Sequence, residues 1–298
     1  MKKFDLSGVH TAFATPHNGD ASSIDWNSFD KLVQRQAESG VRTIVLNGTT
    51  GESPTTKDGE IVQQIVQTRN VVSGRCQIMV GTGTNSTEET IKKTKLATDA
   101  GADAILLVNP YYNKPPQRGM FLHFKAVADS TKLPVVLYNI PGRTGINLET
   151  STLFNLLHGV ENIIGIKEAS GDLIQIEDVC NIKADNFGVL SGDDSLTFKL
   201  MQNTSVRGVV SVASNIVPEE MVQMVDLLLK GNIIEAQKIN ERLTELFRVL
   251  FVESNPIPVK YALSLMGLCK NVLRLPLVPI AKEEGKLVAQ VLKKMNLI

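Results

Sequence analysis

The sequence has no excess of either charge and no long apolar run. Lysine and arginine together number 31, as do aspartate and glutamate, so the formal net charge is zero. A neutral chain has no overall field that would attract nucleic acid or an anionic membrane surface. No stretch reaches the roughly 18 apolar residues of a membrane-spanning helix, and residues 1–10 lack the apolar segment of a signal peptide. We therefore expect neither a nucleic-acid nor a membrane partner, and instead a small molecule or another copy of the chain.

Cysteine and histidine are scarce and widely separated. No C-x-x-C or H-E-x-x-H pattern occurs, which excludes the usual zinc and disulfide frameworks and favours a reducing, cytoplasmic location. Neither G-x-x-x-x-G-K-[ST] nor G-x-G-x-x-G is present, so nucleotide chemistry has no support. We expect no metal and no cofactor, with chemistry supplied by side chains alone. The residues concerned are Cys76, Cys180, Cys269, His10, His17, His123 and His158.

Short β-branched segments recur along the first two thirds of this 298-residue chain, each ending in Gly, Pro, Asn, Thr or Ser. Amphipathic segments separate them, for example at residues 26–40, 87–101 and 148–160. Such alternation predicts a parallel sheet, and eight repeats favour a closed (β/α)8 barrel over an open doubly wound sheet. The predicted strands lie within residues 8–16, 41–53, 76–86, 102–113, 133–145, 162–172, 187–195 and 206–215.

The pattern changes from about residue 217 onward. Long helical periodicity fills residues 219–231, 233–251 and 281–295, with no further convincing strand. We predict a catalytic barrel over residues 1–220 and a helical C-terminal region over residues 221–298.

Active sites of such barrels lie at the carboxyl ends of the strands. Lys167 ends the predicted sixth strand and Tyr138 the fifth, while Thr49 and Thr50 follow the second. All of them would surround one mouth of the barrel.

Lys167 closes an apolar run. A neutral lysine amine can attack a substrate carbonyl to form a Schiff base without metal or cofactor. Burial favours the neutral amine, and we expect Ile164 and Ile166 to supply that burial. Gly165, two residues before the lysine, is expected to leave room for a keto acid. The alternative is a solvated lysine that caps the strand and extends to water.

The other strand-end residues also have two interpretations. Tyr138 is either a core aromatic or the phenol that moves protons during Schiff-base chemistry. Arg143 is either a surface loop arginine or a bidentate partner for a substrate carboxylate. Thr49 and Thr50 either belong to an ordinary glycine turn or bind the carboxylate of a keto acid.

Six motifs, in order, resemble the dihydrodipicolinate synthase family, also called 4-hydroxy-tetrahydrodipicolinate synthases, and they extend nearly end to end. The resemblance implies a (β/α)8 barrel that condenses pyruvate with L-aspartate 4-semialdehyde, a step of diaminopimelate and lysine biosynthesis. It also implies a homotetramer built from tight dimers. The motifs are GTTGES (48–53), NPYYNKP (109–115), YNIPGRTG (138–145), GIKEASGD (165–172), LSGDD (190–194) and FVESNPIPVK (251–260).

When the residue roles of the family are carried over by matching motifs, the resemblance implies that Lys167 forms the Schiff base. It makes Tyr138 a proton relay together with Thr49 and with Tyr112, which in this family reaches in from the neighbouring subunit.

The same resemblance assigns the substrates to further residues. Thr50 and the backbone at Val210 would hold pyruvate, and Arg143 would bind the carboxylate of the semialdehyde and help position Tyr138.

Relatives of this family share the barrel and the lysine, namely N-acetylneuraminate lyase and the 2-keto-3-deoxy sugar acid aldolases. The threonine pair and Arg143 resemble the synthase more, because an arginine suits a small carboxylated aldehyde better than a polyol chain. A barrel that binds a keto acid without turning it over is a third possibility. The presence of Lys167 and Tyr138 argues against it.

Regulation by lysine is the remaining implication. Members inhibited by lysine bind it at a subunit interface, and Ser53, Asn85, Glu89 and Tyr111 match that pattern. Asp58 and Ile61 stand where such members often carry histidine. We therefore expect weak or absent feedback inhibition.

Overall fold

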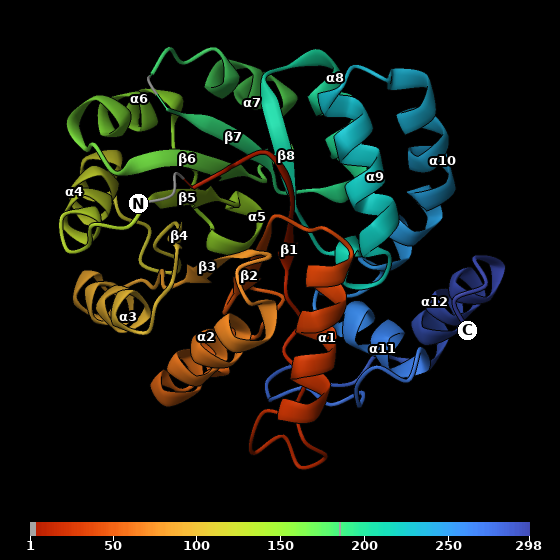
Figure 1. The fold of residues 1–298 in the computed structure, drawn as a ribbon. Coiled ribbons are helices and arrows are strands. Elements are labelled where there is room, and N and C mark those ends of the chain that lie inside the picture. The colour runs from red at the N-terminus through yellow and green to blue at the C-terminus, as the bar shows by residue number, and fades with distance from the viewer. Residues whose placement is uncertain (1–3, 185) are drawn as a thin grey trace.

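The structure, a computed structural model, describes residues 4–184 and 186–298 (Figure 1). Within these ranges, each strand from β1 to β8 runs parallel to the next, and β8 pairs with β1 to close a barrel. The predicted (β/α)8 fold is confirmed, and every strand lies inside its predicted segment. The strands are β1 Gly8–Ala12, β2 Thr43–Leu46, β3 Gln77–Gly81, β4 Ala104–Val108, β5 Val135–Asn139, β6 Ile163–Glu168, β7 Gly188–Ser191 and β8 Val206–Ser211.

Helices surround the barrel and follow its strands (Figure 1). Around the barrel are α1 Trp26–Glu38, α2 Asp58–Val72, α3 Thr87–Asp99, α4 Gln117–Ala128, α5 Pro141–Thr144, α6 Thr150–Gly159, α7 Leu173–Cys180, α8 Asp194–Asn203 and α9 Pro218–Leu229, with the short 3-10 helices η1 Ser53–Thr55 and η2 Ala213–Asn215. After them come α10 Ile233–Val249, α11 Ile257–Leu265 and α12 Lys282–Lys294.

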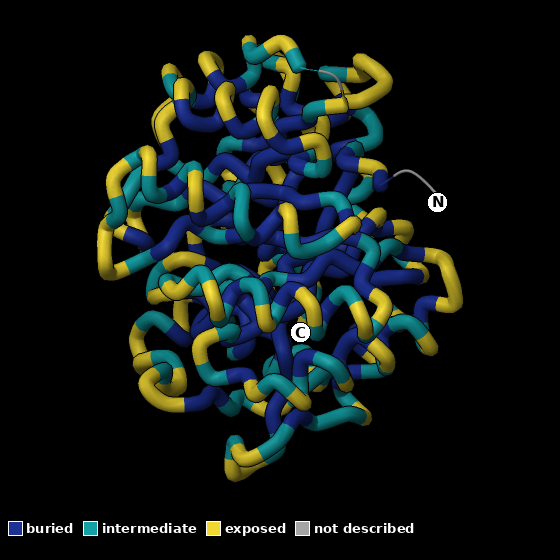
Figure 2. The backbone as a smooth tube through the Cα atoms, turned by 90° about the vertical axis from the view of Figure 1, so that its left-hand side faces the viewer, coloured by how far each residue is buried: buried dark blue, intermediate teal, exposed yellow. Residues whose placement is uncertain are grey.

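The strands are buried on both faces, as parallel strands under helices must be (Figure 2). The amino-terminal end of the barrel is filled by the segment before β1. Phe4 stacks on His10 with ring centroids 6.5 Å apart, and the His10 Nε2 lies 3.2 Å from the Leu6 carbonyl. Burial lowers the pKa of His10 to about 4, so the ring is neutral. Because this end is plugged, a ligand enters from the other.

The C-terminal helices pack on one side of the barrel. Helix α10 contacts α8, α9 and α12, and α11 contacts η2, which follows β8. The predicted division after residue 220 falls inside α9, a helix that contacts β1 and β8. Helix α11 was not predicted, because it is short, follows Pro256 at its N-cap and carries Pro258 in its first turn. In the described part of the chain, no helix has both the length and the apolar character needed to span a membrane.

Candidate active site

Lys167 lies near the carboxyl end of β6 and points into the barrel. Its side chain is only 7% exposed, and Nζ lies 3.9 Å from the centroid of the Tyr138 ring. The two residues are direct neighbours in the β5–β6 register. Among the described residues, Lys167 forms no ion pair. The solvated alternative is therefore wrong, since this amine faces the ring of a buried phenol.

Two details of the prediction for Lys167 are corrected. Side chains alternate between the faces of a strand, so Ile164 and Ile166 lie on the side of the helices and not beside the amine. Tyr138 covers the amine instead. Gly165 also leaves no room for a substrate, because a Cβ there would lie 2.7 Å from the Leu6 side chain at the plugged end.

Gly192 provides space beside the lysine. A Cβ at this position would lie 3.1 Å from the Lys167 Cε and 2.5 Å from the Ala169 Cβ. The Gly192 N–H donates to the Glu168 carbonyl at 2.8 Å. A side chain here would thus press on the lysine and on the hydrogen bond that joins the ends of β6 and β7.

Glu168, the residue after the lysine, is held on the opposite face of β6. Its carboxylate accepts hydrogen bonds from Asn139 at 3.1 and 3.2 Å, from Gln175 at 3.3 Å and from the Ser170 N–H at 2.8 Å. These amide donors hold the carboxylate away from Lys167 and fix the ends of β5 and β6 relative to each other.

Tyr138 and Thr49 line the same small cavity at the carboxyl ends of β2 to β5. Thr49 also lines a larger cavity of about 490 Å³ that opens beside it. The tyrosine is buried, whereas the threonine is partly exposed. The structure therefore brings the predicted phenol and hydroxyl to one site, as expected.

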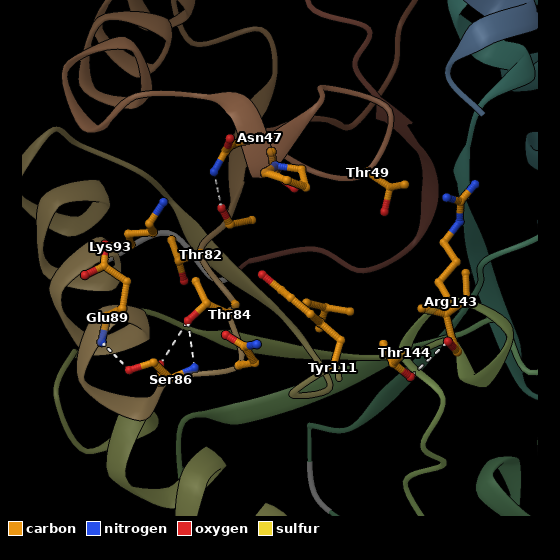
Figure 3. A pocket seen from close by; sticks show the side chains of 17 residues that line it. Asn47, Thr49, Thr82, Thr84, Ser86, Glu89, Lys93, Tyr111, Arg143 and Thr144 are labelled. Atoms are coloured by element: carbon orange, nitrogen blue, oxygen red, sulfur yellow. Dashed lines mark hydrogen bonds between the residues drawn. The ribbon is translucent and has the colours of Figure 1, made fainter. Parts of the chain in front are cut away.

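The larger cavity also contains Arg143 and all four of the residues predicted to bind lysine (Figure 3). Tyr111 lies across its middle, with Glu89 toward one end and Arg143 toward the other (Figure 3). Ser86 caps the α3 helix by accepting from the Glu89 N–H at 3.3 Å. The four residues are Ser53, Asn85, Glu89 and Tyr111.

Thr50 and Arg143 are linked by a residue of the C-terminal region. The Asn255 side-chain amide donates to the Thr50 hydroxyl at 2.9 Å, and the Arg143 guanidinium donates to the Asn255 carbonyl at 3.1 Å. Asn255 belongs to the motif FVESNPIPVK, but the sequence gives no indication of its role. Its contacts depend on segments that are 205 and 112 residues away, which local patterns do not reveal.

The remaining two predicted site residues, Val210 and Tyr112, lie in different surroundings, one buried in a strand and the other exposed in a loop. Val210 is buried in β8, opposite His10 of β1 in the register. Tyr112 is 87% exposed and has a positive φ of 76°, in the loop after β4. A single chain does not bring Tyr112 to Lys167.

Metal-ligating side chains do not gather in this site. In residues 4–184 and 186–298, no group of three or more His, Cys, Asp or Glu side chains could hold a metal ion.

Comparison with known proteins identifies the family. The model of the dihydrodipicolinate synthetase family matches residues 5–295. A 4-hydroxy-tetrahydrodipicolinate synthase of Fervidobacterium nodosum is 42% identical over 294 residues, which cover 98% of this chain and 99% of that protein.

Solved structures agree. The pyruvate complex of a chloride-inhibited dihydrodipicolinate synthase from Acinetobacter baumannii has a TM-score of 0.95 and 41% identity, covering 99% of this chain and 100% of that one. A structure described as a monomeric dihydrodipicolinate synthase variant has a TM-score of 0.95 and 41% identity, with 98% of each chain covered. The chain therefore belongs to the dihydrodipicolinate synthetase family.

Proposed function

We propose that this protein is a 4-hydroxy-tetrahydrodipicolinate synthase, which condenses pyruvate with L-aspartate 4-semialdehyde in the biosynthesis of diaminopimelate and lysine. The observation that carries the proposal is the buried Lys167 amine, which lies 3.9 Å from the Tyr138 ring centroid at the open end of the barrel. A lysine without an ion-pair partner in a buried site is suited to attack a carbonyl.

In the proposed reaction, the Lys167 amine attacks the keto carbon of pyruvate, and the resulting carbinolamine loses water to form the Schiff base. Tyr138 and Thr49 move the protons that these steps release and consume. Loss of a methyl proton then gives an enamine, whose carbon attacks the aldehyde of the second substrate. Finally, the substrate amine displaces the lysine and closes the ring.

Hydrogen-bond donors around Lys167 are the proposed partners of the two substrate carboxylates. Thr50 and the backbone at Val210 would hold the carboxylate of pyruvate. Arg143, which lines the large cavity, would bind that of the semialdehyde. The side chain of Thr50 accepts a hydrogen bond from Asn255, which leaves its hydroxyl proton for the substrate.

The sugar acid aldolases and N-acetylneuraminate lyase remain the alternative for the same lysine. Arg143 favours the synthase, because its guanidinium is anchored on the Asn255 carbonyl at the cavity. A coupled assay with aspartate semialdehyde and with N-acetylneuraminate separates the two substrates.

We also propose that two copies share their active sites through Tyr112, as tight dimers that form a tetramer. The exposed, backbone-constrained Tyr112 supports a contact with another copy. If inactive Tyr112→Phe and Lys167→Ala subunits are mixed, activity should reappear in the hybrid; no recovery would contradict a shared site.

We further propose the cytoplasm as the compartment of this protein, because Cys76, Cys180 and Cys269 are free thiols.

Borohydride reduction in the presence of pyruvate tests the proposed reaction. Peptide mass mapping should find a reduced pyruvyl adduct on the peptide that contains Lys167. The variant Lys167→Ala should give none. An adduct on another lysine, or no adduct on the unmodified protein, would contradict the proposal.

A further inference from the structure

A buried ion pair joins the turn after β2 to the C-terminal region. Glu52 ends the sequence GTTGE and is only 2% exposed. Its carboxylate accepts from the Lys260 Nζ at 2.5 Å and from the Arg274 backbone N–H at 2.9 Å. Lys260 lies in α11, 208 residues further along the chain. Two segments of the C-terminal region therefore hold one carboxylate of the barrel.

Lys260 has a second acceptor. Its side chain is fully buried, and Nζ lies 3.0 Å from the His17 Nδ1. Burial, followed by the nearby charges of Lys260 and Arg274, lowers the pKa of His17 to about 3. The imidazole is therefore neutral, and its Nδ1 accepts from the lysine. Lys260 thus connects the loop after β1 with the turn after β2.

Glu52 has a backbone conformation that depends on its surroundings. Its φ of 60° lies in the left-handed region, which is unfavourable for a residue other than glycine. The same residue closes the turn through its N–H, which donates to the Thr49 carbonyl at 3.1 Å. An anchored Glu52 therefore holds Thr49 and Thr50 in a single arrangement.

Glu60 provides an internal comparison. Its carboxylate pairs with the Arg274 guanidinium at 2.5 and 2.7 Å, at the start of α2. This pair is also well buried, but its guanidinium does not bond Glu52, which Arg274 reaches only through its backbone N–H.

We propose that Glu52 and Lys260 are positioning residues for the pyruvate-binding turn, and that the C-terminal region is in this way part of the catalytic apparatus. The inference rests on the proposed function, in which Thr49 and Thr50 contact the reacting keto acid. A displacement of hydroxyls by about 1 Å is enough to reduce a rate substantially. Loss of the pair should therefore weaken pyruvate capture even in a folded protein.

The experiment compares Glu52→Gln, the double variant Glu52→Gln/Lys260→Met and the control Glu60→Gln. The single Glu52 variant leaves a buried lysine unpaired and is expected to lose much stability. The double variant removes both charges and should regain melting temperature. For the double variant, we expect the pyruvate KM and the pyruvate concentration for half-maximal borohydride trapping to rise at least fivefold. For Glu60→Gln both should stay within twofold of the unmodified protein.

Each outcome decides the inference. If Glu52→Gln does not fold, the double variant alone provides the test. A folded double variant with unchanged KM would overturn the positioning role, as would a Glu60→Gln variant whose KM rises equally. Failure of the unmodified protein to form any pyruvyl adduct would overturn the proposed function and this inference together. An adduct in the unmodified protein combined with unchanged variants would overturn the inference alone.

Discussion

Replacing Gly192 by alanine should disturb Lys167 through a contact that can be specified atom by atom. The new Cβ would lie 2.5 Å from the Ala169 Cβ and 3.1 Å from both the Lys167 Cε and the Glu168 carbonyl oxygen. Because neither Ala169 nor the backbone can bend away, the strand ends must shift. Overpacking of this kind costs about 1–3 kcal/mol of the free energy of unfolding. The shift also displaces the amine, so we expect borohydride trapping of pyruvate to slow at least tenfold.

Urea unfolding measures the first effect, and the trapping rate at limiting and saturating pyruvate measures the second. Gly142→Ala is the matched control, since an added Cβ there meets nothing within 4 Å and alanine favours the helix α5. Wild-type stability and trapping in Gly192→Ala would refute the reasoning. Equal slowing in the control would do the same.

Three further predictions follow from particular contacts. Tyr138→Phe should still form the reduced pyruvyl adduct, but more slowly, because the phenol moves protons during Schiff-base formation. Its kcat should fall by about 10²–10⁴-fold, the range of a lost proton relay, and an unchanged kcat would exclude that role. Burial lowers the pKa of His123 from 6.5 to about 4. The folded state thus keeps this ring neutral, and stability is lost as pH falls below 6.5. Between pH 6.5 and 5 the loss is about 2 kcal/mol, and His123→Gln should remove it in urea unfolding at the two pH values. The same pH dependence in the variant would contradict this assignment. Asp58 is paired with Lys92 at 2.8 Å and Ile61 is fully buried, so L-lysine should inhibit weakly or not at all. Half-inhibition below about 1 mM lysine would show that the cavity binds lysine without these two positions.

Local patterns predicted the architecture well, for a physical reason. Strand and helix periodicities are properties of neighbouring residues, and parallel strands joined by helices have few ways to close. The short helix α11 escaped prediction, because Pro256 at its N-cap and Pro258 in its first turn resemble a loop more than a helix.

The sequence predicted the position of each strand more reliably than the face of the strand on which a given side chain lies. Ile164 and Ile166 were expected beside the lysine only because they are close in sequence. Alternation along β6 places them on the opposite side. Gly165 was likewise assigned to the substrate, yet the Leu6 side chain occupies the space beside it.

The sequence by itself determined the barrel, the set of polar residues at its strand ends and the family to which these motifs belong. Tertiary structure alone decided what surrounds each of them: the Tyr138 ring against the Lys167 amine, the space left by Gly192 and the pairing of Glu52 with Lys260. The reason is that burial and hydrogen bonding depend on contacts between distant segments. Such contacts exist only once the chain has closed into a barrel and the C-terminal helices have packed against it.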